Sequence, residues 1–276
     1  MKPLRRIGPL NSYTVVCYLF LYLPVAVLIA FSFNSSRFSV RWERFTGDWY
    51  LQLIRDPLII DALINSLIIA LVATFFATII GTLTAYGLYR YRFRGKIVFD
   101  GSLFLPIVTP EIVVGISLLI FFMTIQFPLG LFSITVAHVA FDIPFVMLVV
   151  RARLQGMDRS LEEAAMDLGA DEWTTFFRIT IPQLSPGIMA ASLLAFTLSF
   201  NDFVITFFVT GVGSTTLPLK IYSMVRLGVS PKINALSALI VLFSVLLIAI
   251  ADRFQNVRAV VGSGEGDANE NTRRDK

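Results

Sequence analysis

The stretch "SLEEAAMDLGADEWTTFFRITIP", residues 160–182, lies between two long apolar runs of the chain. Its acidic residues cannot lie in hydrocarbon, where a charge is costly. The spacing predicts two short helices. Ser160 and Glu163 fit a capping box, and Gly169 stands where a helix would stop. Asp171 can cap a second helix, so we expect a compact, hydrogen-bonded element here rather than an open loop.

The composition around this stretch indicates an integral membrane protein. Of 276 residues 56% are hydrophobic, only 15% are charged and 25 are phenylalanine, and the mean hydropathy is +0.75. A membrane-crossing helix needs about 20 predominantly apolar residues. We therefore expect an all-α transmembrane domain over residues 1–260, a polar loop over 152–182 and a disordered tail over 261–276. The six predicted spans cover residues 13–33, 62–89, 98–125, 130–150, 186–209 and 233–251.

The basic residues set the expected orientation. Most Lys and Arg fall on the side that holds both termini and the short loop "RYRFRGK", residues 90–96. Because cytoplasmic loops are rich in Lys and Arg, both termini are predicted to be cytoplasmic. The sequence pI of 9.3 thus reflects topology rather than a nucleic-acid partner. Cys17 is the one cysteine, which excludes an intrachain disulfide, and no phosphate-binding G-x-x-x-x-G-K-[ST] motif is present.

We call residues 160–182 the acidic segment. Its first predicted helix has a narrow apolar face. Its members recur at positions i, i+3, i+4 and i+7 and are Leu161, Ala164, Ala165 and Leu168. Such a face can lie on the membrane surface or dock into a groove of another protein. Acidic helices bind anionic lipid poorly, so docking is favoured.

This segment resembles the signature loop of binding-protein-dependent ABC importer permeases, E-A-A-x3-G-x9-I-x-L-P. The matching positions are Glu163, Ala164, Ala165, Gly169, Ile179 and Pro182, and Ile181 stands where leucine is usual. The resemblance implies a MetI-like type I ABC importer permease with six transmembrane helices. It also implies that the acidic segment is a cytoplasmic coupling helix, which sits in a cleft of a separate ATPase subunit.

The resemblance extends along most of the chain. The stretches "SFNSSRF", "LYRYRFRGK", "AFTLSFNDFVITFFVTG" and "LPLKIYSMVRLGVSPKINAL" are similar to the second permease subunit of spermidine/putrescine importers. This wider resemblance implies a multi-pass protein of the bacterial inner membrane that is not itself an enzyme and binds no cofactor. The implied partners are a homologous permease subunit, two ATPase subunits that bind ATP and Mg, membrane lipid, and a periplasmic or surface-tethered polyamine-binding protein.

The predicted spans contain acids without basic partners. No Lys or Arg occurs between residues 101 and 150 or between 182 and 219, yet these stretches hold Glu111, Asp142 and Asp202. A charge at the centre of a helix costs about 2.5–3.5 kcal/mol on insertion scales. The acids therefore need a proton, a partner chain or a positively charged cargo. In a continuous helix at 1.5 Å per residue, Glu111 would lie about 20 Å along its span.

Four residues are candidates for the substrate pathway: Glu111, Asp202, Asn201 and Trp49. Pro106 and Pro110 can break the helix before Glu111 and free carbonyl groups that need a cavity or a protein neighbour. Glu111 and Asp202 can line a cation path or make structural hydrogen bonds. Asn201 is a third candidate, because the spermidine/putrescine permeases that this stretch resembles often carry paired acids at this position. Trp49 can receive an alkylammonium group on its ring or act as an interfacial aromatic.

His138 and Asp142 are four residues apart and share a helical face. Such a pair could relay protons or bind a metal, but it lacks the third and fourth ligands that a metal site needs. An interhelical hydrogen bond is the expected role. A proton-coupled cation transporter is the alternative class, but no inverted repeat supports it. An intramembrane enzyme lacks a nucleophile motif. A related importer for another small solute stays open, although embedded acids without Lys or Arg disfavour anions.

Overall fold

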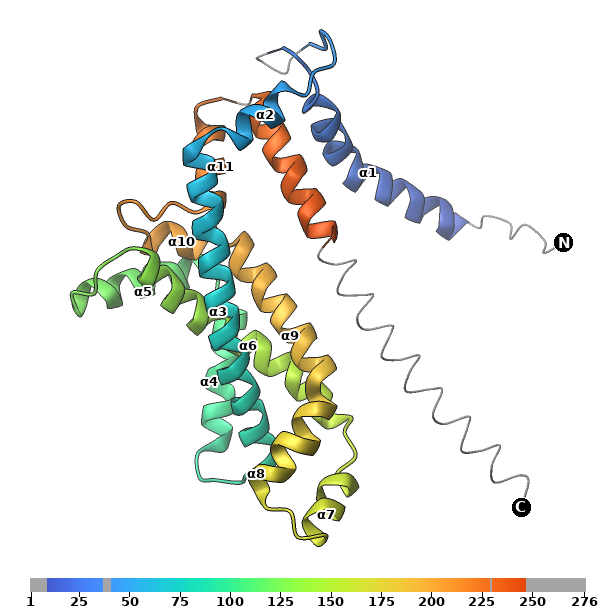
Figure 1. The fold of residues 1–276 in the computed structure, drawn as a ribbon, viewed down its shortest axis with the longest axis vertical. Helices are drawn as coiled ribbons and strands as arrows, with labels where there is room; N and C mark the ends of the chain where they lie inside the picture. The colour runs from blue at the N-terminus through green and yellow to red at the C-terminus, as the bar shows by residue number, and fades with distance from the viewer. Residues whose placement is uncertain (1–8, 37–40, 229, 247–276) are drawn as a thin grey trace, which may run out of the picture. The chain divides into compact units, whose positions relative to one another are not determined.

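The computed structural model describes residues 9–36, 41–228 and 230–246, and the described chain is almost entirely helical (Figure 1). Its contacts form two compact units. The first takes its described residues from Met1–Ile60 and Lys220–Leu246, and the second from Asp61–Leu219. The predicted tail over 261–276 and the end of the predicted span 233–251 lie outside the described residues.

The first unit contains α1 (Pro9–Phe31), α2 (Asp48–Ile54), most of α11 (Leu217–Arg226) and the helix Pro231–Leu246. Asn34 holds the connection between α1 and α2, because its Nδ2 donates to the carbonyl of Arg41 at 2.7 Å and its Oδ1 accepts from the amide of Glu43 at 3.0 Å. Lys232 Nζ donates to Asp56 Oδ2 at 2.6 Å. That hydrogen bond holds the pKa of the Asp56 carboxyl below its ordinary value.

The second unit is built around two long helices that lie along each other, α6 and α9 (Figure 1). The short α10 packs against α5 and α6. One buried apolar cluster gathers around Ala77, Val146 and Leu184, and another around Ile69, Ile134 and Ile205. The helices of this unit are α3 (Pro57–Arg90), α4 (Lys96–Val108), α5 (Glu111–Thr124), α6 (Leu131–Gln155), α7 (Ser160–Asp167), α8 (Glu172–Thr175), the π-helix η1 (Phe176–Thr180), α9 (Ile181–Asn201) and α10 (Val204–Val209).

The predicted all-helical membrane architecture is confirmed. In the described chain four helical stretches are long and apolar enough to cross a membrane, and a bent pair of helices makes a fifth. The helix Pro231–Leu246, in the last predicted span, is described over a shorter length. The four stretches are Tyr13–Phe31, Pro57–Arg90, Leu131–Gln155 and Glu172–Asn201.

Two predicted spans were wrong as single helices. The span 98–125 consists of α4 and α5, which are bent by 110° at Thr109 and Pro110. Thr109 is extended, with ψ 133°, because the ring of a following proline disfavours helical geometry. Pro106 is accommodated inside α4. The depth predicted for Glu111 assumed a continuous helix and does not apply.

The predicted span 186–209 also differs from the structure at both ends. Its helix begins earlier, because α8, η1 and α9 follow one another from Glu172 to Asn201. It stops at Asp202, which has an extended ψ of 129°, and α10 begins at Val204. The expected second short helix of the acidic segment is therefore the start of this long span.

Small residues let α3 and α6 approach closely. A Cβ atom built on Gly81 would lie 2.7 Å from Val146 Cβ and 3.0 Å from the carbonyl oxygen of Ile143. Ala77 and Ala85, one turn on either side, are fully buried. Membrane helices commonly associate through such small-residue faces, because dispersion contacts replace the hydrophobic driving force.

Gly81→Ala is expected to destabilise the protein by about 1–3 kcal/mol, because the new methyl group overpacks the contact with Val146. Gly87→Ala is the matched control, since Gly87 lies in the same helix with nothing within 4 Å of its Cβ position. Thermal unfolding of the purified protein in detergent measures both. Equal Tm values for the two variants would contradict the close approach of α3 and α6.

Candidate functional site

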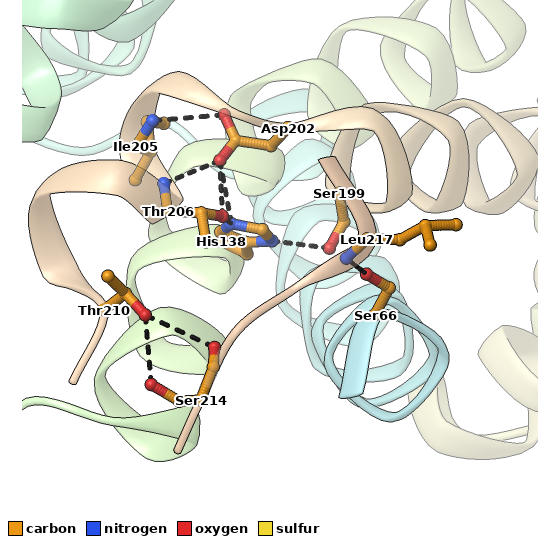
Figure 2. A network of polar contacts seen from close by, with 9 residues as sticks. All are labelled: Ser66, His138, Ser199, Asp202, Ile205, Thr206, Thr210, Ser214 and Leu217. Atoms are coloured by element: carbon orange, nitrogen blue, oxygen red, sulfur yellow. Dashed lines mark hydrogen bonds and ion pairs between the residues drawn. The ribbon is translucent and has the colours of Figure 1, made fainter. Parts of the chain in front are cut away.

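The break between α9 and α10 is stabilised by the carboxylate of Asp202. Its Oδ1 accepts from the amide of Ile205 at 3.3 Å (Figure 2). Its Oδ2 accepts from the amide and from the hydroxyl of Thr206, both at 2.7 Å. The first amides of a helix lack intrahelical partners, and an acid at this position satisfies them and complements the helix dipole. Asp202 therefore ends one helix and begins the next.

His138 of α6 joins this carboxylate to two helices. Its Nδ1 lies 2.7 Å from Ser199 Oγ, and its Nε2 lies 2.9 Å from Thr206 Oγ1 and 3.2 Å from Asp202 Oδ2 (Figure 2). Because the Thr206 hydroxyl donates to Asp202, it accepts from His138, and we assign a proton to Nε2 on that basis. His138 is 2% exposed. The network thus lies in the core of the second unit.

The expected interhelical hydrogen bond is confirmed for His138, whose partners are Ser199, Asp202 and Thr206, but the described residues show none for Asp142. The prediction that no basic side chain pairs the embedded acids was wrong for Asp202, because it counted only Lys and Arg. Spacing along one helix finds neighbours at i+4, not side chains that approach from another helix. Asp142 is 0% exposed, and neither of its carboxylate oxygens has a hydrogen-bond partner among the described residues.

Glu111 is exposed and is the first residue of α5. One turn later Gly115 packs against Phe208 of α10, with 2.6 Å from its Cβ position to that ring. Glu111 and Asp202 thus stand at the starts of two helices that pack together. Asn201 is exposed at the end of α9. Over the described chain, the structure contains no cluster of three His, Cys, Asp or Glu that could hold a metal.

Trp49 belongs to α2 in the first unit and is half-buried. Its indole Nε1 donates to the carbonyl oxygen of Asn34 at 2.8 Å. This contact fixes the ring next to the connection that Asn34 organises.

The acidic segment has the predicted helix end but a different start. Gly169 has φ +90°, and the amide of Ala170 donates to the carbonyl of Ala165 at 3.0 Å, which confirms the glycine stop. Asp171 Oδ1 accepts from the amide of Thr174 at 2.9 Å, which confirms the second cap. The predicted Ser160–Glu163 capping box was wrong. Asp158 Oδ1 instead accepts from the amide of Ser160 at 2.9 Å, so that the helix begins one residue earlier than a serine cap would allow.

The faces of α7 are reversed relative to an ordinary amphipathic helix. Leu161 is 51% exposed and Leu168, just past its end, is 90% exposed. Glu163 and Ala164 are exposed and Ala165 is half-buried, whereas Glu162 is 1% exposed. The segment therefore turns apolar side chains outward and one acid inward. Gly169 at the end of this face and Pro182 in the first turn of α9 are also exposed.

Sequence reasoning singled out Glu163 but missed Glu162. Both are acids of the same short run, and only the direction of each side chain separates them. The sequence does carry one signal for Glu162, because this residue lies off the predicted apolar face. If its carboxylate were buried, it would need a hydroxyl or a basic residue beside it.

Comparisons with known proteins place these features in context. Residues 77–258 match the family described as binding-protein-dependent transport system inner membrane component. The chain is 45% identical over 238 residues to the spermidine/putrescine transport system permease protein PotC of Escherichia coli K12, covering 86% of this chain and 90% of that protein. It is 44% identical over 230 residues to the putrescine transport system permease protein PotI of the same strain, covering 81% and 82%.

A solved structure shows the same fold. It is a bacterial ABC transporter involved in the import of the acidic polysaccharide alginate, with a TM-score of 0.72 and 17% identity. The match covers 90% of this chain and 96% of that chain. At this identity the likeness concerns the arrangement of helices.

Thr206→Val tests the buried network, because valine keeps the shape and removes the hydroxyl shared by His138 and Asp202. We expect a loss of about 1–3 kcal/mol, the penalty for leaving buried polar groups without a partner. Thr197→Val is the control, since the exposed Thr197 donates only to the carbonyl of Leu193. If thermal unfolding in detergent gives both variants the same Tm, the network does not hold α6, α9 and α10 together.

Proposed function

The chain belongs to the family of binding-protein-dependent transport system inner membrane components, and we propose that it is the permease subunit of an ATP-driven spermidine/putrescine importer. The observation that carries this function is the 45% identity to a spermidine/putrescine permease over 86% of the chain. As a permease component the chain is not itself catalytic. A separate ATPase subunit is proposed to bind ATP and Mg and to hydrolyse the ATP.

The cargo path is proposed to pass the break between α9 and α10. Protonated polyamines carry several ammonium groups, which need carboxylate or carbonyl oxygens in place of water. Glu111 and Asp202 stand at the starts of packed helices, the stretches around them contain no Lys or Arg, and Asn201 is exposed beside Asp202. These features support a weak cation site, and weak binding suits transport because the site must also release.

In the described conformation the Asp202 carboxylate is already engaged. The amides of α10, the Thr206 hydroxyl and His138 together supply its donors. A cargo ammonium would therefore add to or replace the His138 contact rather than meet a bare charge.

Trp49 is proposed to receive the alkylammonium group before it enters. The attraction between a cation and an aromatic face is about 0.5–2 kcal/mol.

The exposed side of α7 is proposed to dock on the ATPase. The exposed Glu163 and Ala164, the half-buried Ala165 and the exposed Gly169 form a short, capped projection. The apolar side chains of Leu161 and Leu168 are turned outward beside them. Pro182 lies where this segment passes into α9. Exposed apolar patches of this kind indicate interaction sites. Docking into a groove of another protein would remove these side chains from water.

The assembly is proposed to contain this chain, a homologous second permease subunit and two ATPase subunits. A periplasmic or surface-tethered protein would deliver the polyamine. Both termini and the acidic segment are proposed to lie in the cytoplasm, and the basic loop at residues 90–96 supports this orientation. Specificity for spermidine or putrescine is proposed to come mainly from the binding protein.

Asp202→Asn and Glu111→Gln are each expected to lower the uptake of labelled spermidine by cells by about tenfold. A charge-assisted hydrogen bond contributes about 1.5–3 kcal/mol, and about 1.4 kcal/mol is tenfold. Asp61→Asn, an exposed acid of α3 outside the proposed path, is the control. Normal uptake by both test variants, at normal amounts in the membrane, would rule out the proposed path.

Glu163→Arg is expected to uncouple ATP hydrolysis from uptake, because it reverses a charge on the proposed docking face. Its Tm should stay unchanged, since Glu163 is exposed. Uptake and ATP hydrolysis by the purified complex measure the effect. A variant that imports spermidine at the wild-type ATP cost would show that this face does not dock.

A further inference from the structure

The last residues of α3 and the residue after it hold the acidic segment at successive points. Tyr89 Oη accepts from Arg159 Nε at 2.7 Å, and the guanidinium carbon lies 4.3 Å from the centroid of the Tyr89 ring. Tyr91 Oη donates to Glu172 Oε2 at 3.3 Å. These contacts lie immediately before α7 and at the first residue of α8, so that both ends of the projection are fixed to α3.

Arg90, between the two tyrosines, reaches α7 itself. Its Nη1 lies 3.7 Å from Glu162 Oε2, and its Nη2 lies 3.7 Å from Met166 Sδ. Glu162 and Met166 are one turn apart on the inner side of α7. Arg90 thus contacts the face of α7 that is opposite to the proposed docking face.

Glu162 connects this contact to the next span. Its Oε1 accepts from the Thr180 hydroxyl at 2.6 Å, and Thr180 is fully buried. Thr180 is the last residue of η1, immediately before α9. One buried carboxylate therefore ties α7 to the start of α9 through one oxygen and to the end of α3 through the other. A buried carboxylate without its donors is strongly unfavourable, so these partners are held together.

The π-helix η1 lies at the junction of the same elements. Its wider turn is rare and occurs mostly as a single turn inside an α-helix, frequently at functional sites. Phe176 of η1 also packs on Tyr86 of α3, with 4.7 Å between ring centroids. The aromatic contact therefore joins η1 to α3, and the hydrogen bond of Thr180 joins it to α7.

We propose that Glu162, Thr180 and the α3 end, residues Tyr89–Tyr91, form a clamp that transmits the movement of α7 to α3 and α9 together. In this arrangement Glu162 is a positioning residue that contacts neither cargo nor nucleotide. It acts because its side chain points inward, whereas Glu163 points toward the proposed ATPase. This inference rests on the proposed function, since it assigns a path to the motion that docking delivers.

The clamp is tested in the complex purified with its ATPase and second permease, reconstituted in liposomes and supplied with ATP and the polyamine-binding protein. The measured quantity is ATP hydrolysed per spermidine imported. Thr180→Val keeps the shape and removes the hydroxyl, and it should raise this ratio about five- to tenfold, the effect of one lost hydrogen bond. Thr180→Ser keeps the hydroxyl and should restore the wild-type ratio. Thr197→Val, exposed on α9, should leave the ratio unchanged.

A second measurement does not depend on cargo. Spin labels at the exposed positions Arg92 and Asp167 report the distance between the α3 end and α7 in the same complex. With the clamp intact, adding a non-hydrolysable ATP analogue should leave one narrow distance distribution. In Glu162→Ala it should broaden, because α7 then moves without α3.

Four results would overturn the clamp: a narrow distance distribution in Glu162→Ala, a wild-type ratio for Thr180→Val, an equal defect in Thr180→Ser, or loss of the ATPase from purified Thr180→Val complex. The last result would assign Thr180 to docking instead of transmission. If the wild-type complex imports no polyamine, the proposed function fails. The spin-label distances then decide the clamp alone: a narrow distribution in Glu162→Ala contradicts it, and a broad one supports it.

Discussion

In hydrocarbon every backbone amide and carbonyl must find its partner within the protein, and this constraint shapes the second unit. The helix after Pro182 cannot end in the membrane unless something satisfies the first amides of the next helix. The carboxylate of Asp202 does so, and His138 from α6 completes its set of donors. A residue that is costly in a membrane thus becomes the element that permits the break, and it draws α6, α9 and α10 together.

Much of the fold follows from apolar length and punctuation. The long apolar runs, the glycine stop at Gly169 and the cap at Asp171 are local features, and the structure contains each of them. The position of the break at Pro110 depended on which of two prolines the helix tolerates. Pro106 lies within α4, which continues for two more residues, whereas Thr109, preceding Pro110, takes an extended backbone. Sequence alone indicated a break but not its place.

The side-chain network was less accessible to sequence reasoning. His138 and Asp142 share a helical face, and the expected interhelical hydrogen bond named no partner for either. The actual partners of His138 come from α9 and α10, and only packing between helices brings them near. Glu162 and Glu163 differ by one residue, or about 100° around the helix, and that rotation separates a buried link to Thr180 from an exposed docking residue. Direction around the helix, not residue type, assigns their roles.

We propose that this chain moves polyamines by transmitting the work of a separate ATPase through the acidic segment. The most direct measurement is the accumulation of labelled spermidine in proteoliposomes that contain the chain with its ATPase, its second permease subunit and the binding protein. We expect accumulation only when ATP and the binding protein are both supplied. Accumulation driven by a pH gradient in the absence of ATP would show that the chain is a proton-coupled transporter instead.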